Sequence, residues 1–239
     1  MNQLGIGIYT LSDAARLIRA NPTSIKRWLY GYVYIRRDAA GNKHQHCSKP
    51  LWLPEYGATD FDEKIIGFQD LMEIRIVREF VSRGVPLIIV RKCLDNAREL
   101  FGADYPMNRQ RFLTDGATVY HEAVKAGMQS GEAGLLDLGN KQFAFRTIVK
   151  DSLYAGIEYE DGQATRWYPD GKRGGHVVID PARQFGHPIV KGAGIATSTL
   201  YATYLAEGKV KSLVARIFEV EPAQVDAAVR FEEKLRKAA

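Results

Sequence analysis

A basic stretch near the start of the chain carries side chains that could bind DNA. Asn21 and Pro22 predict the start of a helix, because Asn is a favoured N-cap and Pro a favoured first helical residue. Gly31 would end this helix, and its apolar stripe would consist of Ile25, Trp28 and Leu29. The other side carries donor-rich side chains that can reach phosphates and base edges in a major groove: Thr23, Ser24, Lys26, Arg27 and Tyr30.

A second amphipathic helix is predicted directly before the basic one. Thr10 and Asp13 form a capping-box-like start. Small or apolar residues then recur on one helical face, at Leu11, Ala14, Ala15 and Ile18. Two short helices joined by a tight turn are typical of a helix-turn-helix, which is therefore predicted within residues 9–34.

The distribution of charge favours DNA binding over the alternative that the polar side is only a solvated face. Residues 1–50 hold eight Lys or Arg and two Asp or Glu, a net charge of +6, whereas the whole chain carries +5. The remaining residues therefore sum to −1, and the basic surplus lies wholly in the N-terminal fifth. A localised positive patch on such a motif is the electrostatic signature of a duplex-binding module.

The chain after Gly31 predicts a β-hairpin, or wing, beside the basic helix. Residues 32–35 are β-prone, a basic turn follows, and Leu51 to Leu53 would return as the second strand. The turn would place three further cations on the DNA backbone or minor groove: Arg36, Arg37 and Lys43. His44, His46 and Cys47 are too closely spaced for a structural zinc site, so no metal is expected.

Composition indicates a soluble cytoplasmic protein with an ample hydrophobic core. The chain has 239 residues, of which 46% are hydrophobic. Its two cysteines, Cys47 and Cys93, give no disulfide framework, and Cys93 is predicted to be a buried thiol. No secretory signal pattern and no apolar run long enough to span a membrane is present, so no membrane association is expected.

Two further helices, over residues 68–83 and 86–101, are predicted from apolar periodicity and from Gly84, Pro86 and Gly102. With YTLSDAARLI near the start and SRGVPLIIVRKCL here, residues 8–101 resemble the winged-helix DNA-binding domain of the MerR regulator superfamily. The resemblance implies that Asn21 to Tyr30 enters the major groove and that the wing touches the backbone. The long dimerisation coiled coil typical of that superfamily has no counterpart after Gly102.

The middle of the chain, residues 104–186, is predicted to be a mixed α/β connector. Asp115-Gly116 and Asp161-Gly162 each lie between β-prone residues and predict two hairpins. Val177 to Ile179 predicts another strand. The basic turn from Gly171 to Gly175, with Lys172 and Arg173, lacks the spacing of a phosphate loop and is predicted to be a turn between strands.

Residues 187–239 predict three helices. Thr197 or Ser198 would cap the first, Val210 to Phe218 forms the second, and Pro222 starts the third. This region resembles a small tri-helical domain-of-unknown-function family found in antitoxins, through Gly192, Ile195, the LAEG turn at 205–208, Ile217 and residues 227–229. Ala193-Gly194 replaces the Thr-Arg pair that is usual there.

The whole chain is predicted to be mainly α with small β elements: a winged helix-turn-helix head in residues 1–103, the connector, and the tri-helical tail. In this order the parts resemble VapB-type antitoxins. That resemblance implies a protein that neutralises a PIN-like ribonuclease toxin and, as a homodimer, binds double-stranded operator DNA to repress its own operon. It implies no cofactor. The residues alone favour a duplex DNA-binding regulator.

Two other function classes are weighed against this one. An enzyme is disfavoured because no histidine lies in a catalytic motif, and the acidic group Glu158, Glu160 and Asp161 is explained by solvation at a hairpin turn. A MerR-like regulator that senses a small molecule would need an effector pocket. The aromatic residues that could form one are more often simple core: Phe143, Phe145, Tyr154, Tyr159, Trp167 and Tyr168.

Overall fold

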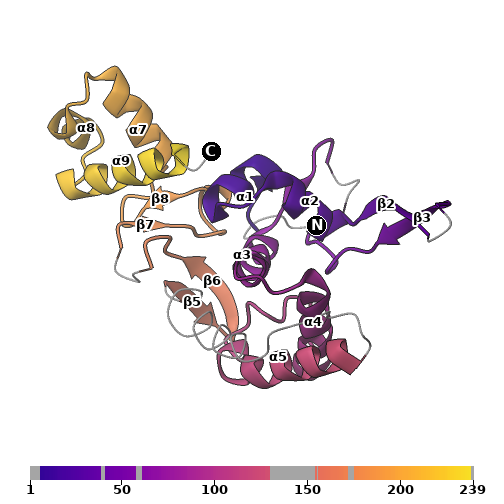
Figure 1. Ribbon diagram of the computed structural model, residues 1–239. Coiled ribbons are helices and arrows are strands. Elements are labelled where there is room, and N and C mark those ends of the chain that lie inside the picture. Colours follow the sequence, from indigo (N-terminus) through magenta and orange to yellow (C-terminus); the bar gives the residue numbers. More distant parts are fainter. Residues whose placement is uncertain are drawn as a thin grey trace.

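The computed structural model describes residues 6–38, 41–57, 61–129, 154, 156–171 and 175–237. Its helices and short antiparallel two-stranded sheets confirm the expected class, mainly α with small β elements (Figure 1). The first elements are β1 (Tyr9–Thr10), α1 (Leu11–Ile18) and α2 (Pro22–Tyr30). Strand β1 pairs with β4 (Ile65–Ile66), so residues far apart in the chain close the first part of the fold.

Both of the first helices begin at side-chain caps. The Thr10 hydroxyl accepts a hydrogen bond from the Asp13 amide at 3.1 Å, and the Asn21 side chain accepts from the amides of Thr23 and Ser24. Arg19 ends α1 in the left-handed conformation, with φ 56°. Only Arg19, Ala20 and Asn21 separate the two helices, so the caps fix the position at which α2 starts.

A β-hairpin follows α2, formed by β2 (Tyr32–Arg37) and β3 (Lys43–Ser48). The prediction that Leu51 to Leu53 forms the returning strand is wrong. Leu51 and Trp52 are instead buried, 3% and 4% exposed, and the Leu51 amide donates to the Trp28 carbonyl. The polar residues 43–48 pair because Asp38 accepts two bonds from Asn42, which sets the register at the turn.

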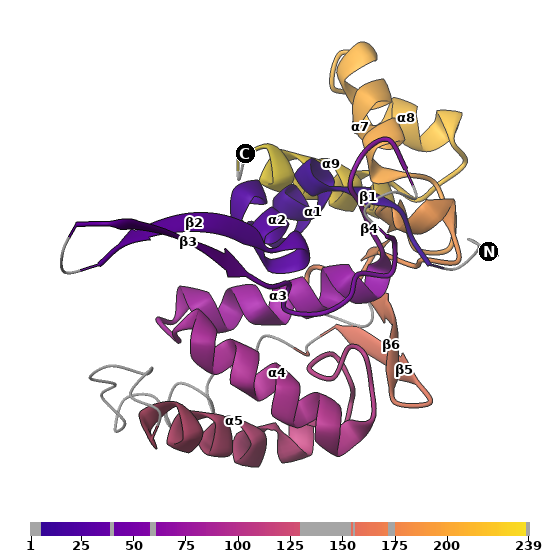
Figure 2. The ribbon, with the colours of Figure 1, turned by 90° about the vertical axis from the view of Figure 1, so that its right-hand side faces the viewer.

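Helix α3 (Phe68–Ser82) runs through the middle of the molecule (Figure 2). Its apolar residues are buried on several sides, and three polar residues near its start are also buried, namely Gln69, Asp70 and Glu73. Each finds partners in other segments. The Trp52 indole donates to Asp70 at 2.8 Å, and the amides of Met107 and Asn108 donate to Glu73 at 3.0 and 2.8 Å.

Helices α4 (Leu87–Phe101) and α5 (Phe112–Gln129) pack against each other beside α3. The hairpin predicted around Asp115-Gly116 is therefore wrong, because both residues lie inside α5. The apolar residues recur at helical spacing and are buried: Phe112, Val119, Tyr120, Ala123 and Val124. A Cβ on Gly116 would lie 2.9 Å from the Phe112 ring, so this glycine serves close packing rather than a turn. Cys93 on α4 is buried, as predicted.

The next segment holds β5 (Ile157–Glu160) and β6 (Gln163–Trp167), which form the hairpin predicted around Asp161-Gly162. Strands β7 (Val177–Val178) and β8 (Ile189–Val190) pair after it, with the short 3-10 turn η1 (Gln184–Gly186) between them. Three bonds tie this segment to the first part of the chain: Ile8 amide to Phe185 carbonyl, Tyr9 hydroxyl to Gly186 carbonyl, and Gln69 side chain to Ala164 carbonyl. One continuous core therefore includes residues from both regions.

The last three helices are α7 (Thr197–Ala206), α8 (Lys211–Ile217) and α9 (Pro222–Arg236), and they share a separate small core. The predicted cap at Thr197 or Ser198 is wrong. Ala196 is the N-cap, and the buried Thr197 hydroxyl instead donates to Glu232 of α9 at 2.5 Å. Helix α9 also packs against α1, which joins this unit to the start of the chain. Among the described helices, none is long and apolar enough to cross a lipid bilayer.

Two carboxyl groups, those of the half-buried Glu55 and the fully buried Glu73, predict that the protein becomes less stable as pH rises. Burial raises the pKa of Glu55 and of Glu73 from 4.5 to about 8. Between these values the folded state binds protons that the unfolded state has released, so the free energy of unfolding falls with rising pH. Each group contributes at most about 1.4 kcal/mol per pH unit. Urea unfolding across this range tests the slope; Glu73→Gln should flatten it, and stability that rises with pH would contradict the assignment.

The close approach of Gly186 to Tyr9 makes a second prediction. A Cβ on Gly186, at φ 81°, would lie 2.2 Å from the Tyr9 hydroxyl oxygen, so Gly186→Ala must also displace that side chain. Gly208 has φ 64° with open space around it. Gly208→Ala therefore measures the backbone strain by itself, about 1–2 kcal/mol. Thermal unfolding should show the larger loss for Gly186→Ala. Equal losses would mean that the contact with Tyr9 is unimportant.

Candidate nucleic-acid interface

The outer face of α2 presents most of the polar side chains that the sequence singled out. Thr23, Lys26 and Arg27 are exposed and Ser24 is half-buried, whereas the opposite side is buried through Ile25, Trp28 and Leu29. Trp28 and Leu29 pack into the same core as α3. The donors of α2 are therefore carried by a helix whose other side is fixed in the main core.

Tyr30 differs from the other predicted contact residues because its hydroxyl group already makes a hydrogen bond within the protein. Its hydroxyl donates to the Ile65 carbonyl at 3.2 Å, and the Lys64 ammonium lies 3.9 Å from the centre of its ring. Burial raises the pKa of Tyr30. In this structure the side chain ties the end of α2 to β4 and does not present a free donor.

Gly31 sets the direction in which the hairpin leaves α2. Its φ is 69°, and a Cβ at this position would lie 2.3 Å from the Ser48 carbonyl oxygen. The two exposed strands project away from the body of the molecule (Figures 1 and 2). The sequence indicated Gly31 only as a helix end; its approach to β3 depends on a partner seventeen residues later and leaves no local signal.

The predicted hairpin cations are all exposed, but they divide between its two faces. Arg37 and Lys43 are cross-strand partners on one face, and Arg36 pairs with His44 on the other. The structure therefore brings Arg37 and Lys43 together and separates Arg36 from them. All three lie within strands, not in the turn where they were predicted.

Sequence reasoning missed an aromatic row that links α2 to the hairpin. The Arg27 guanidinium lies 5.1 Å from the centre of the Tyr32 ring, Tyr34 follows at 5.6 Å between ring centres, and His46 stacks on Tyr34 at 5.4 Å. The alternation of Tyr32 and Tyr34 along one strand could have revealed this face. The opposite face exposes Val33 and Ile35, at 58% and 66%.

The three residues of the hairpin that were considered for a metal do not share one face of β3. His44 and His46 lie on one face of β3 and Cys47 on the other, while His44 contacts Asp38 at 2.9 Å. Across the part of the chain that the structure describes, no three His, Cys, Asp or Glu residues are grouped as a metal would require.

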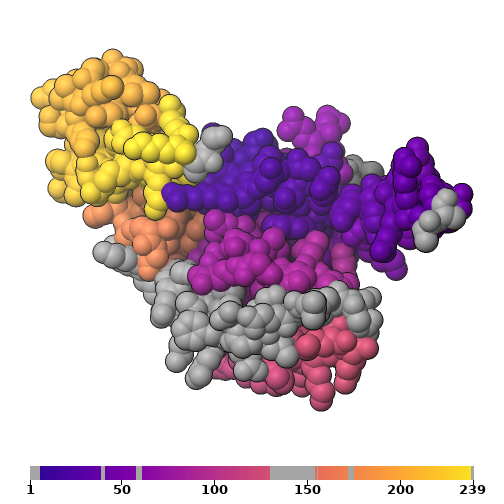
Figure 3. Space-filling view, viewed as in Figure 1, coloured from indigo at the N-terminus to yellow at the C-terminus, as the bar shows by residue number. Residues whose placement is uncertain are grey.

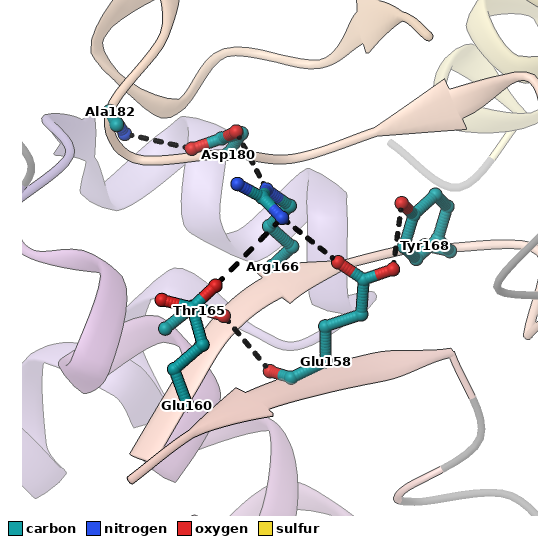
Figure 4. Close-up of polar contacts among 7 residues, drawn as sticks. All are labelled: Glu158, Glu160, Thr165, Arg166, Tyr168, Asp180 and Ala182. Atoms are coloured by element: carbon teal, nitrogen blue, oxygen red, sulfur yellow. Dashed lines mark hydrogen bonds and ion pairs between the residues drawn. The ribbon is translucent and has the colours of Figure 1, made fainter.

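Of the acidic residues at the β5–β6 hairpin, Glu158 is held by an arginine, whereas Glu160 and Asp161 are exposed, as the explanation by solvation expects. Figure 4 shows Arg166 between Glu158, at 3.2 Å, and Asp180, at 2.9 Å, with Glu160 at 4.0 Å. Tyr168 also donates to Glu158 at 3.0 Å. Hydrogen bonds to Asp180 and Glu158 raise the pKa of Arg166. These ion pairs connect β6 to Asp180 in the segment after β7.

Of the described aromatic residues considered for an effector pocket, Tyr154, Tyr159 and Trp167 pack in the main core, and Tyr168 lies in a separate small cluster. Tyr154, Trp167 and Tyr168 are buried, and Trp167 also lines a pocket of about 1060 Å³ between α1, α3, β7 and α9. The Arg75 guanidinium lies 5.0 Å from the Trp167 ring centre, and burial lowers the pKa of Arg75 to about 10. Phe143 and Phe145, like Lys172 and Arg173, lie outside the described residues.

The chain is similar to known proteins both in its tail and over nearly its whole length. Residues 177–231 match a family described as "Protein of unknown function (DUF433)". The chain is 26% identical, over 229 residues, to "Putative antitoxin VapB45" of Mycobacterium tuberculosis (strain ATCC 25618 / H37Rv), a match covering 94% of this chain and 93% of the relative.

A solved structure supports the fold. The X-ray crystal structure of Rv2018 from Mycobacterium tuberculosis matches with a TM-score of 0.65 at 21% identity, over 95% of this chain and 99% of that one. The overall arrangement described above is thus one that an experimentally determined protein also adopts, and the chain is similar along nearly its whole length to the relative named "Putative antitoxin VapB45".

Proposed function

We propose that this protein is a non-catalytic antitoxin of a type II toxin–antitoxin system, which neutralises a PIN-like ribonuclease toxin and binds operator DNA as a homodimer to repress its own operon. The observation that carries the proposal is the similarity to a protein described as an antitoxin across 94% of the chain. A similarity of that extent includes the first helices, the connector and the tail together, and so is not a match to one common module.

The DNA-binding part of the proposal is supported by the outer face of α2 and the hairpin beside it. Lys26 and Arg27 are exposed on a helix whose other side is buried, and the exposed hairpin adds Arg36, Arg37 and Lys43. In a winged helix-turn-helix, such a helix enters the major groove and the wing lies over the backbone. We assign base contacts to Thr23, Ser24 and Arg27, and backbone contacts to Lys26 and the hairpin cations.

A second candidate function is a stand-alone MerR-like regulator that responds to a small molecule. The pocket beside Trp167 favours it, because this pocket lies between the DNA-binding elements and the tail. The two functions differ in what controls DNA binding. A sensor releases or binds DNA when an effector is added, whereas an antitoxin does so when its toxin is added.

One prediction from the DNA-binding proposal concerns the α2 face. Arg27→Ala should weaken specific operator binding by about 1–3 kcal/mol if the guanidinium reads a base edge. Arg216→Ala, which removes an exposed arginine from α8, is the matched control and should leave binding unchanged. Fluorescence anisotropy with operator and mixed-sequence duplexes measures both. Unchanged operator affinity in a folded Arg27→Ala protein would remove Arg27 from the interface.

Another prediction from the same proposal concerns the hairpin. Neutralising Arg36 and Arg37 should weaken binding to all duplexes alike, because phosphate contacts carry no sequence information. The slope of log affinity against log salt concentration should flatten by about one unit for each phosphate that is no longer neutralised. A salt titration of anisotropy gives this slope. An unchanged slope would show that the hairpin does not touch the backbone.

The toxin and the dimer are tested together. Co-expression with the neighbouring gene, followed by pull-down and light scattering, should give a stable complex with a PIN-like nuclease whose ribonuclease activity is suppressed. On operator DNA, light scattering should report the mass of a dimer of this chain, because helix-turn-helix proteins commonly bind paired half-sites. A protein that remains alone yet shifts its own promoter would instead support the stand-alone regulator, and a monomeric mass on DNA would overturn the dimer.

A further inference from the structure

A small basic cleft lies where the end of α1 meets the C-terminal half of α9. The cleft is about 520 Å³ and is lined by Arg19, Arg230, Glu233, Lys234 and Lys237. All five side chains are exposed, and four of them are cationic. Residues 230, 234 and 237 recur at the spacing of one helical face, so α9 presents a row of positive charge to α1.

The carboxylates of α9 compensate this row only in part. Glu233 lines the cleft itself and offsets one of its four cations. Glu232 is buried and accepts the hydrogen bond from Thr197, so it faces the tail core. Asp226 pairs with Arg230 at 2.9 Å and also with Lys211. Among the described residues, Lys234 and Lys237 have no side-chain partner at ion-pair distance.

Helix dipoles account for single cations here but not for their convergence. A lysine or arginine in the last turn of a helix is stabilised by the exposed carbonyls, which would explain Arg19 on α1 and Lys237 on α9 taken separately. Cations from two different helices that line one cleft repel each other, and this repulsion costs stability. An anion bound in the cleft would remove that cost.

The cleft lies near the start of α2. Arg19 precedes Asn21, the N-cap of α2, by only two residues. Figure 1 shows α9 at one end of the α1–α2 pair and the hairpin at the other, and Figure 3 shows the same order on the surface of the molecule. Basic side chains therefore lie on both flanks of the helix assigned to the major groove.

We propose, on the basis of the DNA-binding role inferred above, that the cleft formed by Arg19, Arg230, Lys234 and Lys237 binds the phosphate backbone of the same duplex, on the flank opposite the hairpin. The tail thereby becomes part of the DNA interface through one face of α9. Contacts on both flanks position α2 in the groove, and those of α9 add affinity that does not depend on sequence.

The test compares two charge-matched double variants of the full chain. Lys234→Gln/Lys237→Gln removes two cations from the cleft, and Lys125→Gln/Arg216→Gln removes two exposed cations from α5 and α8. Salt titrations use a mixed-sequence duplex about three helical turns long. The cleft variant should flatten the salt slope by about two units, one for each lysine that no longer neutralises a phosphate. The control variant should keep the slope of the unchanged protein.

Thermal unfolding without DNA separates a binding role from a structural one. If the cleft binds phosphate, Lys234→Gln/Lys237→Gln relieves repulsion and the Tm stays the same or rises. If the two lysines only stabilise the helix end, the Tm falls and the salt slope is unchanged, which would overturn the proposal. If the cleft variant and the unchanged protein bind the duplex with the same salt slope, the proposal for the cleft is overturned and the DNA-binding role of α2 is not. Failure of the unchanged protein to bind any duplex would overturn the DNA-binding role as well.

Discussion

The burial of three polar side chains at the start of α3 constrains most of the remaining fold. A carboxylate or amide buried without partners costs several kcal/mol, so Gln69, Asp70 and Glu73 require donors and acceptors from elsewhere in the chain. They find them in Trp52, in the amides of Met107 and Asn108, and in the Ala164 carbonyl. One helix thereby fixes the segment after the hairpin, the connection between α4 and α5, and strand β6.

This scaffold explains how two short helices can present a defined surface. Helices of eight and nine residues are marginal alone, and their position must come from packing. Trp28 and Leu29 fix α2 in the core that surrounds α3, and Tyr30 bonds to β4. Gly31 then directs the hairpin by its contact with β3. The basic side chains thus occupy fixed positions on a rigid element, which suits recognition of a repeating phosphate backbone.

The sequence predicted best those elements whose ends carry local chemistry. Asn21-Pro22, Gly102 and Pro222 each mark a helix boundary within one residue of its observed position, because a cap acts on its immediate neighbours. The α2 face followed from periodicity alone. Errors arose where a distant partner overrode a local signal: Asp115-Gly116 lies in a helix that packs on α4, and Leu51 enters the core instead of pairing with β2.

Within the candidate interface, contacts between residues far apart in the sequence could not be predicted either. Nothing near Tyr30 indicates that Ile65 and Lys64 will engage it, and nothing near Arg19 indicates that α9 will return beside it. The sequence assigned charge to the first fifth of the chain, whereas the structure extends the basic surface with residues from the last helix. Segments joined only by folding leave no pattern in a single sequence.

Hydrogen–deuterium exchange of the protein with and without its promoter duplex tests the central claim most directly. The account predicts slower exchange of the amides at the start of α2, along β2 and β3, and in the last turns of α9, with little change in α5. Protection confined to other elements, with α2 and the hairpin exchanging as in the free protein, would contradict it.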